Sequence, residues 1–197
     1  MSCITAGRLP TRPHSLRSLA LALLVALVGV TCSGTIAPSA RAADEALLPP
    51  PGSCGTLEQT PPTNSSRSYW STPAQCLINA VRVKKGLSPI APDEYMSQAA
   101  SLKGRDIVRC GVFSHNPCGL GDYSYFPATY LLPGHLASET IAWGTNMTAR
   151  GAVLAWLGSP THHDILLNPG FTNFAVWATI GYQGNAANKV WVGTFGG

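Results

Sequence analysis

Helical spacing of apolar residues becomes regular shortly after residue 71. The sequence Thr72-Pro73-Ala74-Gln75 combines a capping threonine, a proline suited to the first helical position and the glutamine of a capping box. Apolar residues then recur on one face as far as Gly86, a residue that commonly ends a helix. These apolar residues are Leu77, Ile78 and Val81. The pattern predicts a first helix up to Gly86.

Two further helices and a helical turn follow in the pattern. Pro92 opens the second helix and Gly111 ends it, and one face of this helix is apolar. The apolar face carries Met96, Ala99, Ala100, Ile107 and Cys110. Thr148 caps a third helix, which Gly158-Ser159-Pro160 breaks. A short helical turn is expected from His162 to Leu166.

Three strands are expected in the second half of the chain. Glu139–Trp143 is short, aromatic and β-branched, and a long loop from Asn116 to about Leu136 precedes it. Ala175–Tyr182 and Val190–Phe195 read as a hairpin, with residues 184–189 as its loop. Helices in the first part and a terminal hairpin predict an α+β domain, with helices packed on a small sheet.

The first 42 residues have the pattern of a secretory signal peptide. Residues 1–18 are basic and contain no acid, Leu19–Val30 is apolar throughout, and Ala40-Arg41-Ala42 is a cleavage-site sequence. The apolar run is shorter than the roughly 20 residues that span a bilayer. Cleavage is expected near Ala42 or Ala43. An uncleaved signal anchor and lipid attachment at Cys32 are the alternatives.

The next segment, residues 43–70, is rich in proline and lacks any core-forming period. Its prolines are Pro49, Pro50, Pro51, Pro61 and Pro62. We therefore expect a linker over residues 43–70, anchored only by Cys54, and a folded domain over residues 71–197.

The net charge of the chain falls to zero once the expected signal peptide is left out of the count. The whole chain carries a formal net charge of +4, with 11% charged residues. Residues 1–43 hold four of its 13 basic residues and none of its nine acidic ones, so the expected mature chain is neutral. No basic face is left to favour nucleic acid, and no polybasic cluster is left to favour anionic lipids. The low charge and 45% hydrophobic content also exclude a disordered polyelectrolyte.

Four cysteines remain in the expected mature chain: Cys54, Cys76, Cys110 and Cys118. Export makes disulfide bonds the default, and four cysteines allow three connectivities. The pairs Cys54–Cys76 and Cys110–Cys118 are favoured because each links neighbouring segments. A zinc site built from these four cysteines is disfavoured because no close Cys-x2-Cys pair occurs.

Three short segments could carry chemistry. Phe113-Ser114-His115 follows the second helix between the last two cysteines, where a local disulfide would position the imidazole. Glu139 begins an apolar strand, where a carboxylate is costly unless it is paired or at a wet edge. His162 and His163 point about 100° apart on a helical turn, so at most one of them shares a site. Taken singly, each also fits a purely structural role as a turn, surface or helix-cap residue.

Two imidazoles and a carboxylate that converged would resemble a His2Glu zinc centre with an open position. They would equally form a polar cavity floor that binds a ligand through hydrogen bonds. Established catalytic patterns are absent from the sequence, including His-Glu-x-x-His, Gly-x-Ser-x-Gly and a phosphate loop.

Several segments in order resemble the CAP superfamily, which comprises cysteine-rich secretory proteins, insect venom allergens and plant pathogenesis-related proteins. The resemblance is to the compact secreted bacterial type, the SCP domain, and it runs from about Cys76 to Phe195. The matching segments are Cys76–Arg82, Gly86–Ile90, Phe113–His115, Glu139 with Ile141–Gly144, Ser159–His162, Ile165–Pro169, Phe171–Gly181 and Val190–Phe195.

The resemblance implies an α-β-α sandwich whose cavity holds His115, Glu139 and His162. In the family this cavity has been linked to divalent metal, often zinc, and nearby clefts to lipids or peptides. The sequence departs from the family at Ser138-Glu139-Thr140, where Gly-Glu-Asn is usual. Thr161 replaces a glycine, and Trp156-Leu157-Gly158 lacks the second cavity glutamate of animal and plant members.

These observations favour a secreted binding or interaction module, extracellular or in the cell envelope, with a groove for a lipid, glycan or peptide. A zinc-dependent hydrolase acting on peptide, ester or cell-wall material is the alternative, and a disulfide-stapled envelope protein with a vestigial site is a third. Membership of the family implies no general catalytic activity. We expect a monomer with no nucleic-acid partner and no transmembrane segment after signal cleavage.

Overall fold

A computed structural model describes residues 40–63, 70–121, 125–126, 135 and 137–197. The expected signal peptide lies outside the described residues except for its last three positions, and the expected long loop is described only in part. No helix within the described ranges combines the length and the apolar character needed to cross a membrane.

A four-stranded sheet forms the centre of the fold, in the order β1-β3-β4-β2. The strands are β1 (Ala91–Pro92), β2 (Ala137–Thr145), β3 (Asn173–Tyr182) and β4 (Asn185–Gly196). Only β1 runs parallel to its neighbour, so the sheet is mostly antiparallel, as expected. The two-residue β1 is not signalled by the sequence pattern.

The hairpin between β3 and β4 is tighter than the sequence predicts. Tyr182 pairs with Asn185, so the turn consists of Gln183 and Gly184 alone. Both have positive φ, 52° and 74°, as a two-residue hairpin turn of this type requires. The polar residues 185–189, expected to form a loop, instead extend β4.

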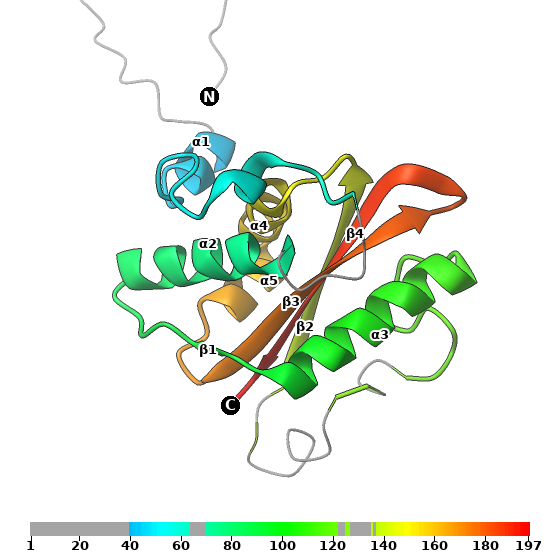
Figure 1. The fold of residues 1–197 in the computed structure, drawn as a ribbon. Helices are drawn as coiled ribbons and strands as arrows, with labels where there is room; N and C mark the ends of the chain where they lie inside the picture. The colour runs from blue at the N-terminus through cyan, green and yellow to red at the C-terminus, as the bar shows by residue number, and fades with distance from the viewer. Residues whose placement is uncertain (1–39, 64–69, 122–124, 127–134, 136) are drawn as a thin grey trace, which may run out of the picture. The chain divides into compact units, whose positions relative to one another are not determined.

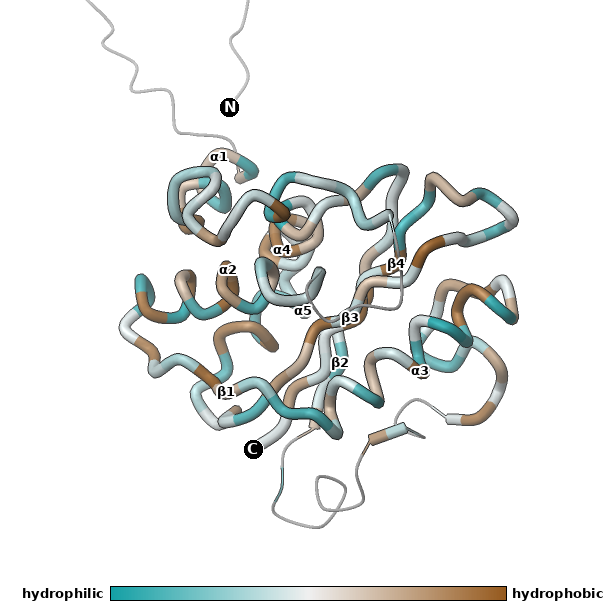
Figure 2. Tube along the Cα trace, in the orientation of Figure 1, coloured by the Kyte–Doolittle hydropathy of each residue, from teal (hydrophilic) through white to brown (hydrophobic). Residues whose placement is uncertain are grey.

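Helices cover both faces of the sheet, which confirms the α-β-α sandwich (Figure 1). One face is covered by α3 (Glu94–Cys110). The other is covered by α2 (Ser71–Lys84), α4 (Ala149–Leu157) and α5 (Pro160–Leu166). Apolar and polar segments recur from turn to turn along α2 and α3, as amphipathic helices require (Figure 2).

Strand alternation divides the core between the two faces. Ile141 and Val192 pack with Ile107 of α3. The intervening positions Ala142 and Trp191 belong to the larger apolar cluster under the other three helices. Successive side chains of a strand point to opposite faces, so both layers of helices are held by the same strands.

Helix ends follow the sequence signals except at the starts of α2 and α3. Asp93 accepts a hydrogen bond from the Met96 amide at 2.8 Å and caps α3, while Thr148 accepts one from Gly151 at 3.0 Å and caps α4. The expected cap at Thr72 is wrong, because α2 begins at Ser71. The expected start of the second helix at Pro92 is also wrong, because Pro92 lies in β1 and α3 begins at Glu94 after its cap.

The N-terminal segment, residues 40–63, differs from the expected linker. It contains α1 (Ala40–Glu45) and the 3-10 helix η1 (Thr56–Gln59). Its Leu48 is buried in the apolar cluster beneath α2 and α4. The disulfide Cys54–Cys76 joins this segment to α2, as the favoured pairing predicts.

A buried ion cluster also holds the N-terminal segment on the domain. Glu58 has no exposed surface, and its carboxylate accepts a hydrogen bond from Arg150 Nη1 at 2.6 Å. The amides of Gly52 and Cys54 also donate to Glu58, each at 3.1 Å. Arg150, on α4, pairs with Glu45 of α1 as well. Glu58 and Arg150 are 92 residues apart, so periodicity within either segment does not reveal the pair.

Replacing Arg150 with leucine is expected to lower the free energy of unfolding by about 3–5 kcal/mol, because the buried Glu58 carboxylate loses its cation. Urea unfolding of the oxidised protein, followed by circular dichroism, measures the change. Arg109→Leu is the matched control, since that side chain is 67% exposed and surface pairs contribute about 0–1 kcal/mol. Equal unfolding midpoints for the two variants would contradict the prediction.

Candidate polar site beside strand β2

His115 and Glu139 meet where the loop after α3 approaches β2. The loop is closed by the disulfide Cys110–Cys118, again the favoured pairing, with a Cα–Cα distance of 5.7 Å. Glu139 points to the α3 face of the sheet, two positions before Ile141. Its Oε1 lies 2.8 Å from His115 Nδ1. Two of the three predicted residues are therefore in direct contact.

Lys103 is a member of this site that the sequence analysis missed. It lies on α3 with a side chain 1% exposed, and its Nζ is 3.4 Å from Glu139 Oε1. The same ammonium group donates a hydrogen bond to the backbone carbonyl of His115. Lys103 stands four residues before Ile107, within the apolar face of the helix. A lysine at a core-facing position of a predicted helix indicates a polar site, because a buried ammonium requires a partner. This signal could have identified Lys103.

The second oxygen of the Glu139 carboxylate is a buried acceptor that is not satisfied. Among the residues that the structure describes, Glu139 Oε2 has no hydrogen-bond partner. The side chain is 3% exposed, so bulk water does not readily solvate this oxygen. An unsatisfied buried acceptor is destabilising, and at a candidate site it offers a position for a donor from a ligand.

His162 approaches from α5, on the other side of the sheet. Burial lowers its pKa, and the charge of a protonated His115 lowers it further. The lowered pKa favours the neutral imidazole, the form that binds metals. His163 pairs instead with Asp164 at 3.4 Å on the surface, as expected if only one of the adjacent histidines shares the site.

The helix that carries His162 is fixed at its C-terminal end by Arg82 of α2. Arg82 Nη1 donates to the carbonyls of Leu166 and Asn168, at 2.8 and 2.9 Å. Its Nε donates to the carbonyl of Ser88 at 3.0 Å. Arg82 is 1% exposed, and its cation faces the C-terminal carbonyls of α5, where positive charge is favourable. This buried guanidinium therefore positions His162 from a distance.

The three predicted ligands do not form a ready-made metal centre. Within the described part of the chain, no group of three or more His, Cys, Asp or Glu side chains is arranged to hold a metal ion. Glu139 faces His115 and the Lys103 ammonium, which already balances its charge. The arrangement matches a carboxylate that orients a histidine through one of its ring nitrogens, here Nδ1 of His115.

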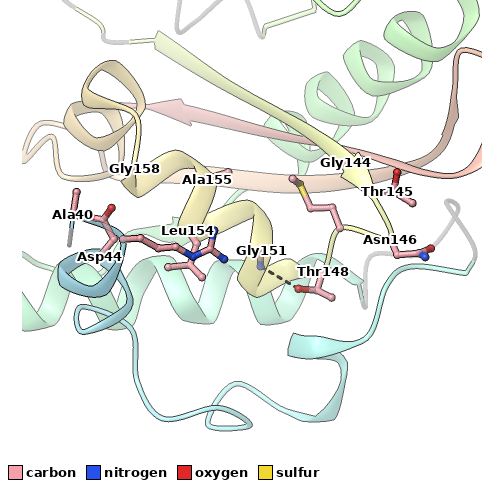
Figure 3. A pocket seen from close by; sticks show the side chains of 12 residues that line it. Ala40, Asp44, Gly144, Thr145, Asn146, Thr148, Gly151, Leu154, Ala155 and Gly158 are labelled. Atoms are coloured by element: carbon pink, nitrogen blue, oxygen red, sulfur yellow. Dashed lines mark hydrogen bonds between the residues drawn. The ribbon is translucent and has the colours of Figure 1, made fainter. Parts of the chain in front are cut away.

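A pocket of about 600 Å³ lies elsewhere, between α1, α4 and the end of β2 (Figure 3). Its walls include Ala40 and Arg41, and none of the three predicted ligands. Cleavage near Ala42 or Ala43 would remove part of this wall. The pocket is therefore a weaker candidate than the histidine–glutamate pair.

A disulfide-bonded α-β-α sandwich with this pair beside β2 defines a protein of the SCP-domain class. The chain belongs to the cysteine-rich secretory protein (CAP) family, whose family model matches residues 76–195. This match covers most of the folded domain, including all three predicted site residues.

Individual relatives support the bacterial type. The chain is 32% identical over 124 residues to the uncharacterized protein YkwD of Bacillus subtilis (strain 168), covering 61% of this chain and 48% of that protein. It therefore spans about half the length of this curated relative. A crystal structure of an extracellular protein containing an SCP domain from Bacillus anthracis str. Ames matches with a TM-score of 0.53 and 26% identity, covering 64% of this chain and 39% of that one. An outer surface protein from Borrelia burgdorferi shares the fold, with a TM-score of 0.53 and 20% identity over 62% of this chain and 87% of its own.

Lys103→Met and Glu139→Gln are each expected to lower the free energy of unfolding by roughly 3–5 kcal/mol, because each leaves the other buried charge without its partner. The double variant removes both charges, so its loss should be clearly smaller than the sum of the single losses. Urea unfolding of all four proteins measures the coupling. Additive losses would contradict a direct interaction between the two side chains.

Proposed function

We propose that this chain is an exported binding module and that its polar site binds a divalent metal ion, zinc in the first place, through His115 and His162. The observation that carries the proposal is the 2.8 Å contact between His115 Nδ1 and Glu139 Oε1. A metal-binding histidine commonly donates a hydrogen bond from the N–H of its second ring nitrogen to a carboxylate, which fixes the tautomer and the orientation of the ring.

Export is supported by three independent features. The first 42 residues have the composition of a secretory signal peptide, and four cysteines form two disulfide bonds. Structural relatives are described as an extracellular protein and an outer surface protein. These features favour an extracellular or cell-envelope location.

The charge of the site favours a particular kind of metal binding. Lys103 balances the Glu139 carboxylate, so a bound cation would meet two neutral imidazoles rather than an anionic ligand. Imidazole suits zinc, copper and nickel better than calcium or magnesium, which prefer oxygen ligands. The proposal therefore predicts a site that a chelator empties readily and that discriminates against calcium.

Two further parts of the function stay as proposals. A groove for a lipid, glycan or peptide is the first, in keeping with a binding module that has no established catalytic motif. A zinc-dependent hydrolase is the second, and no described contact at the polar site favours it over binding. Turnover of a peptide, ester or cell-wall substrate by the zinc-loaded protein, lost in Glu139→Gln, would raise the hydrolase above the binding module.

Chelator-treated protein is expected to bind one zinc ion in calorimetric titration, and His115→Ala and His162→Ala should each abolish saturable binding. Glu139→Gln should weaken binding by about 10–100-fold, the range found when a carboxylate that orients a ligating histidine is lost.

His163→Ala is the matched control, because His163 is adjacent to His162 in the chain but pairs with Asp164 on the surface. It should bind zinc like the unmodified protein. Thermal unfolding identifies any variant that loses binding through misfolding. Absence of saturable zinc binding in the unmodified protein, or equal losses in His162→Ala and His163→Ala, would refute the proposed metal site.

A further inference from the structure

A second pocket lies at the β3 edge of the sheet, between the first turns of two helices. Residues of the first turns of α2 and α3 form its walls together with Trp177 of β3, and its volume is about 550 Å³. This volume lies within the roughly 300–1,000 Å³ typical of small-molecule sites. The pocket shares no residue with the histidine–glutamate site.

The topology of the sheet explains why a pocket forms there. β1 pairs only with Asn173 and Phe174, so Trp177 lies beyond the end of this short edge strand. α2 and α3 cover opposite faces of the sheet and both begin beside this stretch of β3 (Figure 1). The space between the two helical layers is therefore lined by two helix starts and one aromatic ring.

Trp177 provides an aromatic surface that is firmly supported. Part of the side chain packs against the apolar cluster under α3, and part lines the pocket. A half-buried tryptophan can present its flat face to a ligand without reorganisation, which reduces the entropic cost of binding.

Apart from Pro92, the remaining walls are polar and carry negative charge. Thr72 and Ser97 contribute hydroxyl groups, Gln75 an amide and Glu94 a carboxylate, and the described lining includes no lysine or arginine. Asp93 lies in the same wall, where its carboxylate caps α3. The hydroxyl and amide groups can donate hydrogen bonds to the hydroxyl groups of a ligand and accept hydrogen bonds from them. The two carboxylates also accept hydrogen bonds, and they repel an anionic ligand.

Ser71 gives an independent indication of a missing partner. This residue lines the pocket, is 4% exposed, and its Oγ has no hydrogen-bond partner among the residues that the structure describes. Buried hydroxyls are normally satisfied, so Ser71 adds an unmet hydrogen-bonding group to a residue of the pocket wall.

We propose that this pocket binds a neutral saccharide, with a sugar ring stacked on Trp177 and its hydroxyl groups bonded to the polar walls. A sugar ring has an apolar C–H face and a polar rim, and the pocket offers one aromatic surface within a polar surround. An organic cation would match the carboxylates but would leave the hydroxyl and amide groups of the wall unused. The inference rests on the binding-module part of the proposed function, for which it names a pocket and a ligand class, and it uses none of the proposed metal-binding residues.

The test is isothermal titration calorimetry of the full mature protein with three neutral trisaccharides: triacetylchitotriose, cellotriose and maltotriose. At least one should bind saturably, and trigalacturonic acid, which is anionic, should not. Trp177→Leu keeps an apolar side chain against the α3 cluster but removes the aromatic face, so it should weaken binding at least tenfold. Glu94→Gln and Ser71→Ala should each weaken binding several-fold through lost hydrogen bonds.

Matched controls separate the pocket from general effects of an aromatic or surface substitution. Trp143→Leu changes another tryptophan, 42% exposed and outside the pocket, and Tyr95→Ala changes a 70% exposed residue next to Glu94. Both should bind the saccharide normally, as should His115→Ala.

Three results would overturn the proposal. These are no saturable binding of any neutral trisaccharide, equal losses in Trp177→Leu and Trp143→Leu, or loss of binding in His115→Ala with retention in Trp177→Leu. Zinc titration of the same preparations shows whether the polar site is intact, so failure here is distinguishable from failure of the metal proposal.

Discussion

A buried charge must meet a partner of fixed geometry, and this constraint determines how the elements of the domain are joined. Lys103 of α3 meets Glu139 of β2, which links a helix to the sheet at the polar site. Arg150 of α4 meets Glu58, which links the N-terminal segment to the helical layer. Arg82 of α2 meets two carbonyls at the end of α5. Each contact spans elements that are distant in sequence, in a chain with only 11% charged residues.

Local patterns in the sequence were sufficient for most of the fold. The apolar faces of the main helices, the cap at Thr148 and the terminal hairpin all depend on residues within a few positions of each other. The favoured disulfide pairs also join near neighbours, and both are formed. The errors have a different origin. The segment expected to be a linker packs on the domain through contacts that include the Glu58–Arg150 pair, and no local period indicates this pair.

The sequence predicted part of the candidate site, and it did so through the resemblance to the family. Resemblance to the family supplied His115, Glu139 and His162, and the structure places the first two in contact. Lys103 was missed because its partner Glu139 lies on another element, 36 residues away in the sequence.

The sequence departs from the family at Thr140, where asparagine is usual, and the structure shows how this residue is accommodated. Thr140 Oγ1 is buried and has no hydrogen-bond partner within the described residues. A Cβ on residue 193 would lie 2.6 Å from that oxygen, so the glycine at this position leaves room for the Thr140 side chain.

The closed loop between Cys110 and Cys118 ties the polar site to the redox state of its surroundings. His115 lies inside this loop, and its backbone carbonyl and its imidazole are held separately, by Lys103 and by Glu139. In the reducing interior of a cell the loop would be open, and the imidazole would lose one of its constraints. An oxidising compartment would therefore hold the loop that carries His115 more firmly than a reducing one would.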